Sequence, residues 1–190
     1  MQRSRLPISS SPKKSLADLA WQLRRASIDD AAALSLVAGA SFLETFAGIL
    51  DGADIVAHCA ANSSPAAFSA FVAADATIVS IAELDAGRAP VGYTVLTTPD
   101  LPVPVTMSDI ELKRIYALER THGTGLGAAL MKRALADARI AGCARVLLGV
   151  YGGNYRAHRF YEKHGFAVIG TRRFRVGATL HDDRVYAINL

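Results

Sequence analysis

The chain has 190 residues, 51% hydrophobic and 20% charged, which is typical of one globular domain. No apolar run approaches the ~20 residues of a membrane span, and no apolar stretch follows the first basic residues as in a secretory signal. Cys59 and Cys143 are too few for a disulfide framework. We therefore expect a cytoplasmic protein with no membrane partner.

The formal charge of +4 comes from one short segment. Arg3, Arg5, Lys13 and Lys14 lie within the first fifteen residues, which contain no acid, and they account for the excess of 21 basic over 17 acidic residues. The rest of the chain is neutral, so nucleic acid is not expected as a partner. We expect a disordered basic tail at 1–15 and a single domain at 16–190.

The first half alternates between short strands and helices. Ser27 followed by Asp29 and Asp30 predicts a helix start, and Gly39 is expected to end that helix. Three prolines make 98–109 a loop. The elements expected here are a strand at 21–26, helices at 29–39, 53–61 and 65–74, and strands at 77–84 and 91–97.

The second half has a stronger pattern. Apolar residues recur every four positions from Leu126, which predicts an amphipathic helix that ends before Gly142. The elements expected are strands at 110–118 and 145–150, helices at 125–141 and 154–164, and closing strands at 167–176 and 184–190. A strand, a helix and a strand in this order form a right-handed parallel crossover. The fold class is therefore α/β with a mixed sheet.

A glycine-rich turn, HGTGLGA at 122–128, joins the strand ending at 118 to the following helix. Glycines allow positive φ and close approach of a ligand, and the first N–H groups of a helix attract phosphate. A phosphate loop of the Walker type would need Lys-Ser/Thr after the last glycine, which this turn lacks. The dinucleotide pattern fits, but its ribose-binding acid is missing, because no acid lies between Asp137 and Glu162.

The turn instead resembles the diphosphate loop of the GNAT superfamily of N-acetyltransferases, Gln/Arg-x-x-Gly-x-Gly/Ala, with His122 replacing Gln or Arg. A second stretch, Asn154-x-x-Ala-x-x-Phe-Tyr161-x-x-x-Gly-Phe166, is similar to the helix motif of that superfamily. The resemblance covers about residues 21–190. It implies a largely antiparallel sheet with helices on both faces, acetyl-CoA as cosubstrate and no metal.

The resemblance also implies a role for each matching residue. Tyr161 would be the general acid beside the thioester sulfur, Glu111 the base that accepts the proton of the amine, and Asn154 a contact to the pantetheine arm. The coenzyme A diphosphate would bind at His122, Gly123, Thr124, Gly125, Leu126, Gly127 and Ala128. Main-chain groups for the pantetheine amides and the thioester carbonyl would come from Ile115, Tyr116, Ala117 and Leu118.

Simpler interpretations stay open for three of these residues. Tyr161 could only pack, Asn154 could only cap its helix, and Glu111 could be a solvent-exposed or an ion-paired carboxylate at a strand start. For the whole chain, the alternatives are a non-catalytic acyl-CoA-binding module and a dinucleotide-binding oxidoreductase.

From this resemblance we expect the acceptor to be an amine of a small molecule or a peptide N-terminus. Two stretches look like the bacterial spermidine/spermine acetyltransferase subgroup: Glu-Leu-x-Arg-Ile-Tyr at 111–116, and Phe174-x-x-Gly177 with Asp183. That subgroup carries Gln-Thr-Asp-Leu where this chain has His-Asp-Asp-Arg at 181–184. Polyamine, amino acid, antibiotic and protein amine all remain open as acceptors, as do monomer and homodimer.

Overall fold

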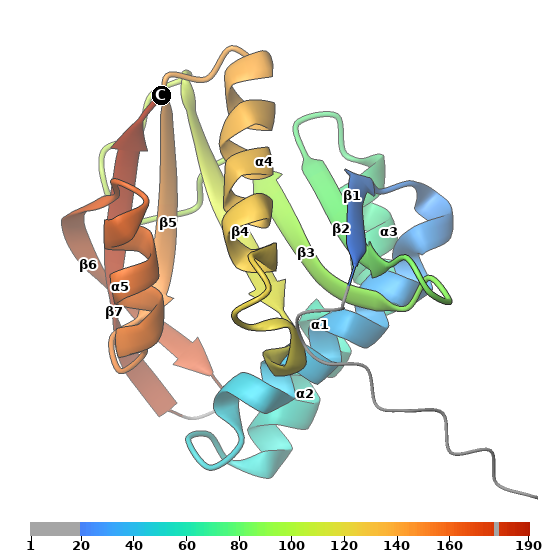
Figure 1. Cartoon of the computed structure of the whole chain (residues 1–190). Helices are drawn as coiled ribbons and strands as arrows, with labels where there is room; N and C mark the ends of the chain where they lie inside the picture. The colour runs from blue at the N-terminus through green and yellow to red at the C-terminus, as the bar shows by residue number, and fades with distance from the viewer. Residues whose placement is uncertain (1–19, 177–178) are drawn as a thin grey trace, which may run out of the picture.

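A twisted sheet forms the centre of the computed structural model, which describes residues 20–176 and 179–190 (Figure 1). Its seven strands follow the order β1-β2-β3-β4-β5-β7-β6, and neighbours are antiparallel except for the parallel pair β4–β5. The strands are β1 Trp21–Arg25, β2 Ile78–Leu84, β3 Pro90–Thr97, β4 Asp109–Ala117, β5 Arg145–Tyr151, β6 Ala167–Val176 and β7 Thr179–Asn189. The predicted α/β class and the parallel crossover are confirmed.

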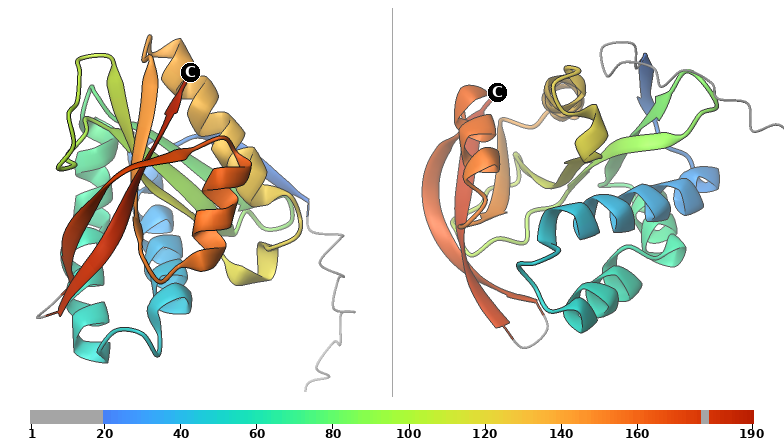
Figure 2. Two further views of the ribbon diagram at one scale, coloured as in Figure 1. Left: turned by 90° about the vertical axis from the view of Figure 1, so that its left-hand side faces the viewer. Right: turned by 60° about the horizontal axis from the view of Figure 1, so that its bottom comes forward.

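Helices cover both faces of this sheet, α1, α2 and α3 on one and α4 and α5 on the other (Figure 2). They are α1 Ala31–Phe46, α2 Gly52–Asn62, α3 Pro65–Ala73, α4 Leu126–Ile140 and α5 Tyr155–Lys163. Several begin at the side-chain caps typical of helix starts. Ser64, for example, accepts the N–H of Ala67 before the first turn of α3.

Each face has its own apolar core. Under α4 and α5, Leu112 and Leu148 of the sheet pack against Met131 and Tyr161. On the other face, Leu34 of α1 and Phe68 of α3 pack against strand residues that include Tyr93. The two cores hold the helices against the sheet. A site can form in the middle of the sheet, between β4 and β5.

The strands β4 and β5 diverge soon after they begin. They pair only from Asp109 opposite Arg145 to Glu111 opposite Leu147. Beyond this short seam the two strands separate. A bulge lies just past it, because Leu112 and Arg114 face consecutive residues of β3 and Lys113 has no counterpart.

Two predicted boundaries were wrong. The first helix was expected to end near Gly39 but runs to Phe46, because Ser41 and Phe42 continue its buried stripe and this packing outweighs the ~1 kcal/mol helix penalty of a glycine. The last strand was expected at 184–190 but begins at Thr179, where its hairpin with β6 starts. The tail expected at 1–15 and Gly177 lie outside the described residues.

Candidate active site

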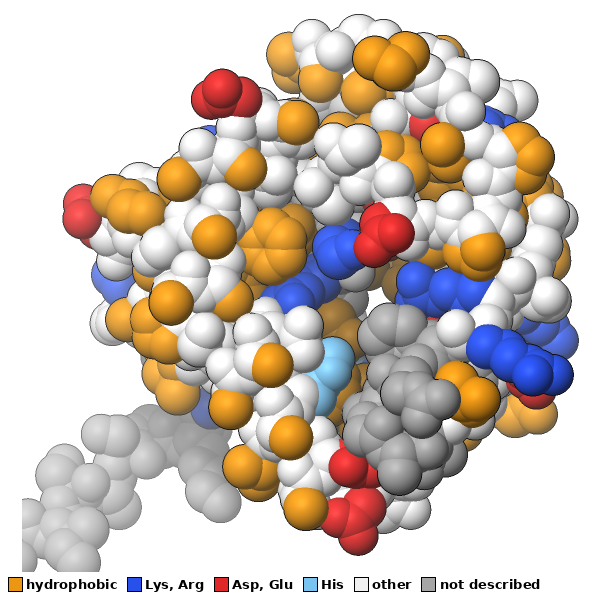
Figure 3. All heavy atoms as spheres, turned by 180° about the vertical axis from the view of Figure 1, so that it is seen from behind, with side chains coloured by type: hydrophobic (Ala, Val, Ile, Leu, Met, Phe, Trp, Pro, Cys, Tyr) orange, Lys and Arg blue, Asp and Glu red, His pale blue; other side chains and the backbone are white. Residues whose placement is uncertain are grey.

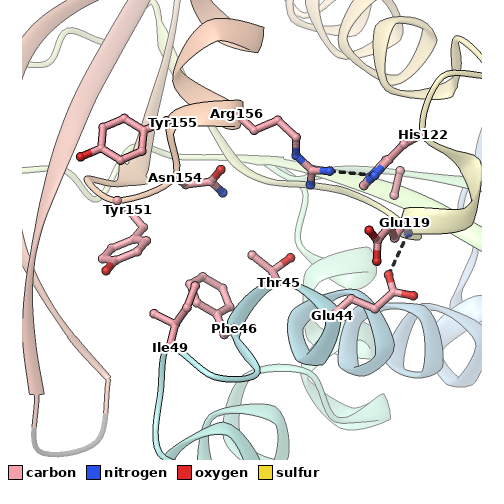
Figure 4. A pocket seen from close by; sticks show the side chains of 12 residues that line it. Glu44, Thr45, Phe46, Ile49, Glu119, His122, Tyr151, Asn154, Tyr155 and Arg156 are labelled. Atoms are coloured by element: carbon pink, nitrogen blue, oxygen red, sulfur yellow. Dashed lines mark hydrogen bonds between the residues drawn. The ribbon is translucent and has the colours of Figure 1, made fainter.

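The gap between β4 and β5 opens into a cavity of about 390 Å³ (Figure 4). Its walls come from the end of α1, the end of β4 with the following turn, and the β5–α5 connection. Three predicted residues line it: Ala117, His122 and Asn154. The segments that carry the two sequence motifs therefore meet at one cavity.

The glycine turn has the backbone that its sequence predicts. Gly123 and Gly125 have φ of +82° and +87°, and Gly125 is the N-cap of α4. The first helical bond runs from the N–H of Ala129 to the carbonyl of Gly125. The N–H groups of residues 126–128 consequently have no acceptor inside the helix, and they make the start of α4 suited to an anion.

A guanidinium that the sequence analysis missed stands beside this turn. Arg156, from the first turn of α5, donates from Nη1 to Nδ1 of His122 at 2.7 Å (Figure 4). Burial, and then the charge of Arg156, lower the pKa of His122, so the imidazole is neutral and can accept. The sequence held one signal of this contact. His122 stands where the superfamily motif has Gln or Arg, so another residue has to provide the cation or amide at this position.

The β4 edge that faces the gap offers main-chain groups. The N–H of Leu118 donates to Val91 of β3 at 2.9 Å, and Tyr116 lies opposite Tyr93 of the same strand. Because main-chain groups alternate between the two edges of a strand, those of Ile115 and Ala117 point to the side of β5. Of the four predicted main-chain positions, these two are directed into the gap.

Tyr161 is enclosed near the C-terminal end of α5. Its ring packs edge-on against Phe166, with centroids 5.9 Å apart, and only 8% of the residue is exposed. Burial, with a smaller effect of the neighbouring Tyr116 phenol, raises the pKa of Tyr161. The phenol therefore keeps its proton at neutral pH, as a general acid must.

Asn154 and His158 organise the start of α5. The side chain of Asn154 accepts the N–H of Ala157 at 3.0 Å while it lines the cavity, so the capping interpretation holds and leaves room for a ligand contact. His158 is buried, and its ring nitrogens lie 3.0 Å from the Tyr186 hydroxyl and 3.0 Å from the Gly152 carbonyl. These contacts connect α5 to β7 and to the β5–α5 connection.

Glu111 lies at the seam, on the face opposite Tyr161. It is 2% exposed, and its Oε2 accepts the N–H of Asp100 at 2.8 Å and lies 3.9 Å from Nζ of Lys113. Glu111 is therefore not a solvent-exposed residue, and its contact with Lys113 agrees with the ion-paired interpretation. It does not line the cavity that Asn154 and His122 share.

Comparison with known proteins fits this geometry. The profile of the acetyltransferase (GNAT) family matches residues 40–166. The chain belongs to the GNAT family. Proteins named as uncharacterized N-acetyltransferases in Mycobacterium tuberculosis and Mycobacterium bovis are 39% identical over 156 residues, which is 82% of this chain and 95% of theirs.

Solved GNAT structures share the fold. The paiA N-acetyltransferase of Thermoplasma acidophilum, in complex with coenzyme A, superposes with a TM-score of 0.75 at 22% identity, over 90% of this chain and all of that one. The yncA protein of Salmonella typhimurium, solved with acetyl-CoA, gives 0.63 at 20% identity, over 90% and 94% of the two chains.

Neither cysteine of this GNAT chain is suited to act as a nucleophile. Burial raises the pKa of Cys59 and of Cys143, which disfavours the thiolate at either position. Over 20–176 and 179–190, no cluster of three or more His, Cys, Asp or Glu side chains could hold a metal. Nor does any helix in these ranges have the length and apolar character to cross a bilayer.

Proposed function

We propose that the protein transfers the acetyl group of acetyl-CoA to a primary amine, by direct attack within a ternary complex. The observation that carries this proposal is the β4–β5 gap with the start of α4 at its mouth. A strand edge and a helix N-terminus together suit a molecule that combines amide groups with a diphosphate.

The residues around the gap fit coenzyme A. The unpaired N–H groups of 126–128 would bind the diphosphate, with Arg156 adding the charge that His122 does not carry. Ile115 and Ala117 would pair with the pantetheine amides as an added strand, next to Asn154. When bound, acetyl-CoA supplies an acyl group activated as a thioester.

Glu111 and Tyr161 would serve the two proton transfers. Free amines have a pKa near 10 and are mostly protonated at neutral pH, so Glu111 would accept the ammonium proton, through water because it is enclosed. As the N–C bond forms and the C–S bond breaks, Tyr161 would donate its proton to the departing sulfur. The nitrogen would lose its second proton as the amide forms, and that proton would return to the Tyr161 phenolate through water. An N–H on the gap-facing edge of β4 would stabilise the oxyanion.

A thiol-release assay with Tyr161→Phe tests this function. The unmodified protein should release free coenzyme A from acetyl-CoA with at least one amine of a broad panel. The variant should lose about 100- to 10,000-fold in rate and still bind coenzyme A, because the phenol acts only in the chemical step. Unchanged thiol release by the variant would remove Tyr161 from the mechanism.

Two alternatives give different results in the same experiments. A non-catalytic acyl-CoA-binding module would be stabilised by coenzyme A and release no thiol with any amine. A dinucleotide oxidoreductase would be stabilised by NAD(P) instead. A ligand at a hundredfold excess over its Kd adds about 2.7 kcal/mol to stability, which a melting experiment detects.

A further inference from the structure

The sheet face that carries α1–α3 has a basic hollow. Figure 3 shows this face, where Lys and Arg side chains gather in and around a depression beside a histidine. We define the basic hollow by Asn62 of α2, Arg114 and Tyr116 of β4, and Arg172 with Asp183 from the β6–β7 hairpin. The charges of Arg114, Asp183 and Arg172 all act on the Tyr116 phenol, which places these groups around it.

The bulge at Lys113 puts Arg114 in this hollow. Successive strand residues point to opposite faces, so Leu112, which packs under α4, leaves Glu111 on the α1–α3 side. Without the bulge Arg114 would share the face of Leu112. The extra residue reverses the alternation, and Arg114 points the same way as Glu111, with Cα atoms within about 10 Å of each other.

Arg114 lacks a negative partner among the described residues. Its guanidinium lies 5.5 Å and 5.1 Å from the ring centroids of Phe68 and Phe71, and Nη2 donates to the Asn62 carbonyl at 2.7 Å. The other terminal nitrogen, Nη1, is shielded from solvent and makes no hydrogen bond in the described part of the chain. The Tyr93 phenol lies close to the guanidinium but carries no negative charge to neutralise it.

The other half-buried arginines of the described residues are neutralised by carboxylates within the protein. The pairs, with their N–O distances, are Arg24–Asp30 at 2.6 Å, Arg133–Asp137 at 2.9 Å, Arg145–Asp109 at 2.6 Å and Arg172–Asp183 at 3.1 Å. A partly buried guanidinium without such a partner destabilises the folded protein because it has lost solvation. A bound anion offsets this desolvation free energy. The exception therefore points to a counter-charge from outside the chain.

We propose that Arg114 binds the carboxylate of the acceptor, and that the acceptor is a free amino acid. This inference rests on the proposed acetyl transfer. Glu111 and Arg114 lie on the same face of the sheet. Glu111 would accept the proton of the amino group, and Arg114 would bind the carboxylate, so each end of an amino acid would meet a group of opposite charge. A polyamine such as spermidine brings only positive charge and would be repelled by Arg114.

Matched acceptor pairs test the preference without any mutation. Each amino acid is compared with its carboxamide and with the amine lacking the carboxylate, alongside spermidine, by thiol release from acetyl-CoA. A carboxylate held by a guanidinium should raise kcat/KM about 10- to 100-fold over the carboxamide. Equal use of acid and amide, or a preference for spermidine, would overturn the inference.

The variant Arg114→Gln tests the residue. In this variant, the KM for amino acids should rise toward the KM for their carboxamides. The kcat for amino acids and the rate with carboxamides should change little. The control is Arg173→Gln, since the Arg173 side chain is 76% exposed on the same hairpin and should change neither. An equal loss with acids and amides, in a variant still stabilised by coenzyme A, would assign Arg114 to packing alone.

Failure of the proposed function gives a separate result. If no amine in the panel releases thiol, the acetyl transfer is wrong, and the inference is decided by binding. Amino acids should then raise the melting temperature of the coenzyme A complex in the parent and in Arg173→Gln but not in Arg114→Gln. An equal rise in all three proteins, or no rise in any, would overturn it.

Discussion

Substituting Gly125 by alanine should show whether coenzyme A binding depends on the backbone conformation of the glycine turn rather than on side-chain packing. Gly125 has φ of +87°, and a Cβ built on it meets no atom within 4 Å. The substitution therefore introduces no clash, and its effect comes from backbone strain alone. An L-residue in this left-handed region costs about 1–2 kcal/mol.

That strain has two measurable consequences. For a chain of this length, about 1–2 kcal/mol lowers the melting temperature by roughly 2–8 °C. If the turn relaxes to relieve the strain, the N–H groups at the start of α4 change direction. Each hydrogen bond to a charged group is worth about 1.5–3 kcal/mol, so we expect calorimetry to show coenzyme A bound about 10- to 100-fold more weakly.

Gly142→Ala is the matched control. Gly142 follows the far end of α4 with φ of +77°, and a Cβ built on it also meets no atom within 4 Å. Alanine there should cost about 1–2 kcal/mol as well and leave coenzyme A binding unchanged, because the residue lies outside the glycine turn. Equal loss of binding in both variants, or parental affinity in Gly125→Ala, would refute the argument from backbone conformation.

Three further results are expected. Arg156→Ala should raise the Kd for coenzyme A about tenfold, with an effect that shrinks at high salt, whereas the exposed Arg159→Ala on the same helix should change it less than twofold by calorimetry. Burial lowers the pKa of His122 and also that of His58 below 6.5, so around that pH the folded protein binds fewer protons than the unfolded chain, and urea melts should show stability falling as the pH drops through about 6.5. His122→Asn should reduce this slope, and an unchanged slope would contradict its origin. His158→Ala should lower the unfolding free energy by about 2–4 kcal/mol through the loss of both buried ring contacts, and a smaller loss would show that they are dispensable.

The fold was predictable wherever local signals decide it. Positive φ at Gly125 and the period of α4 depend on residue type and spacing, and the structure confirms them. The end of α1 was missed because a glycine at position 39 weakens a helix only slightly, while the contacts of Phe42 come from elsewhere. Its ring stacks on His58 of α2, with centroids 4.3 Å apart, which no local pattern reveals.

The candidate site was predictable only in part, for the same reason. The segments of both motifs meet at one cavity, as their resemblance implied. The contact between Arg156 and His122 joins residues 34 positions apart, and the N–H of Asp100 reaches Glu111 from a loop. The side on which Arg114 points depends on one unpaired residue in β4, and sequence alternation would place it on the wrong face.

The brevity of the β4–β5 seam has a consequence for the dynamics of the whole domain. Three residue pairs, ending at Glu111 and Leu147, join one half of the sheet to the other, and past them both strands present open edges to each other. Amide hydrogens along those edges should exchange with solvent quickly until a molecule of matching length fills the slot. A ligand bound as we propose would therefore complete the sheet, and its binding would hold the two halves together more firmly.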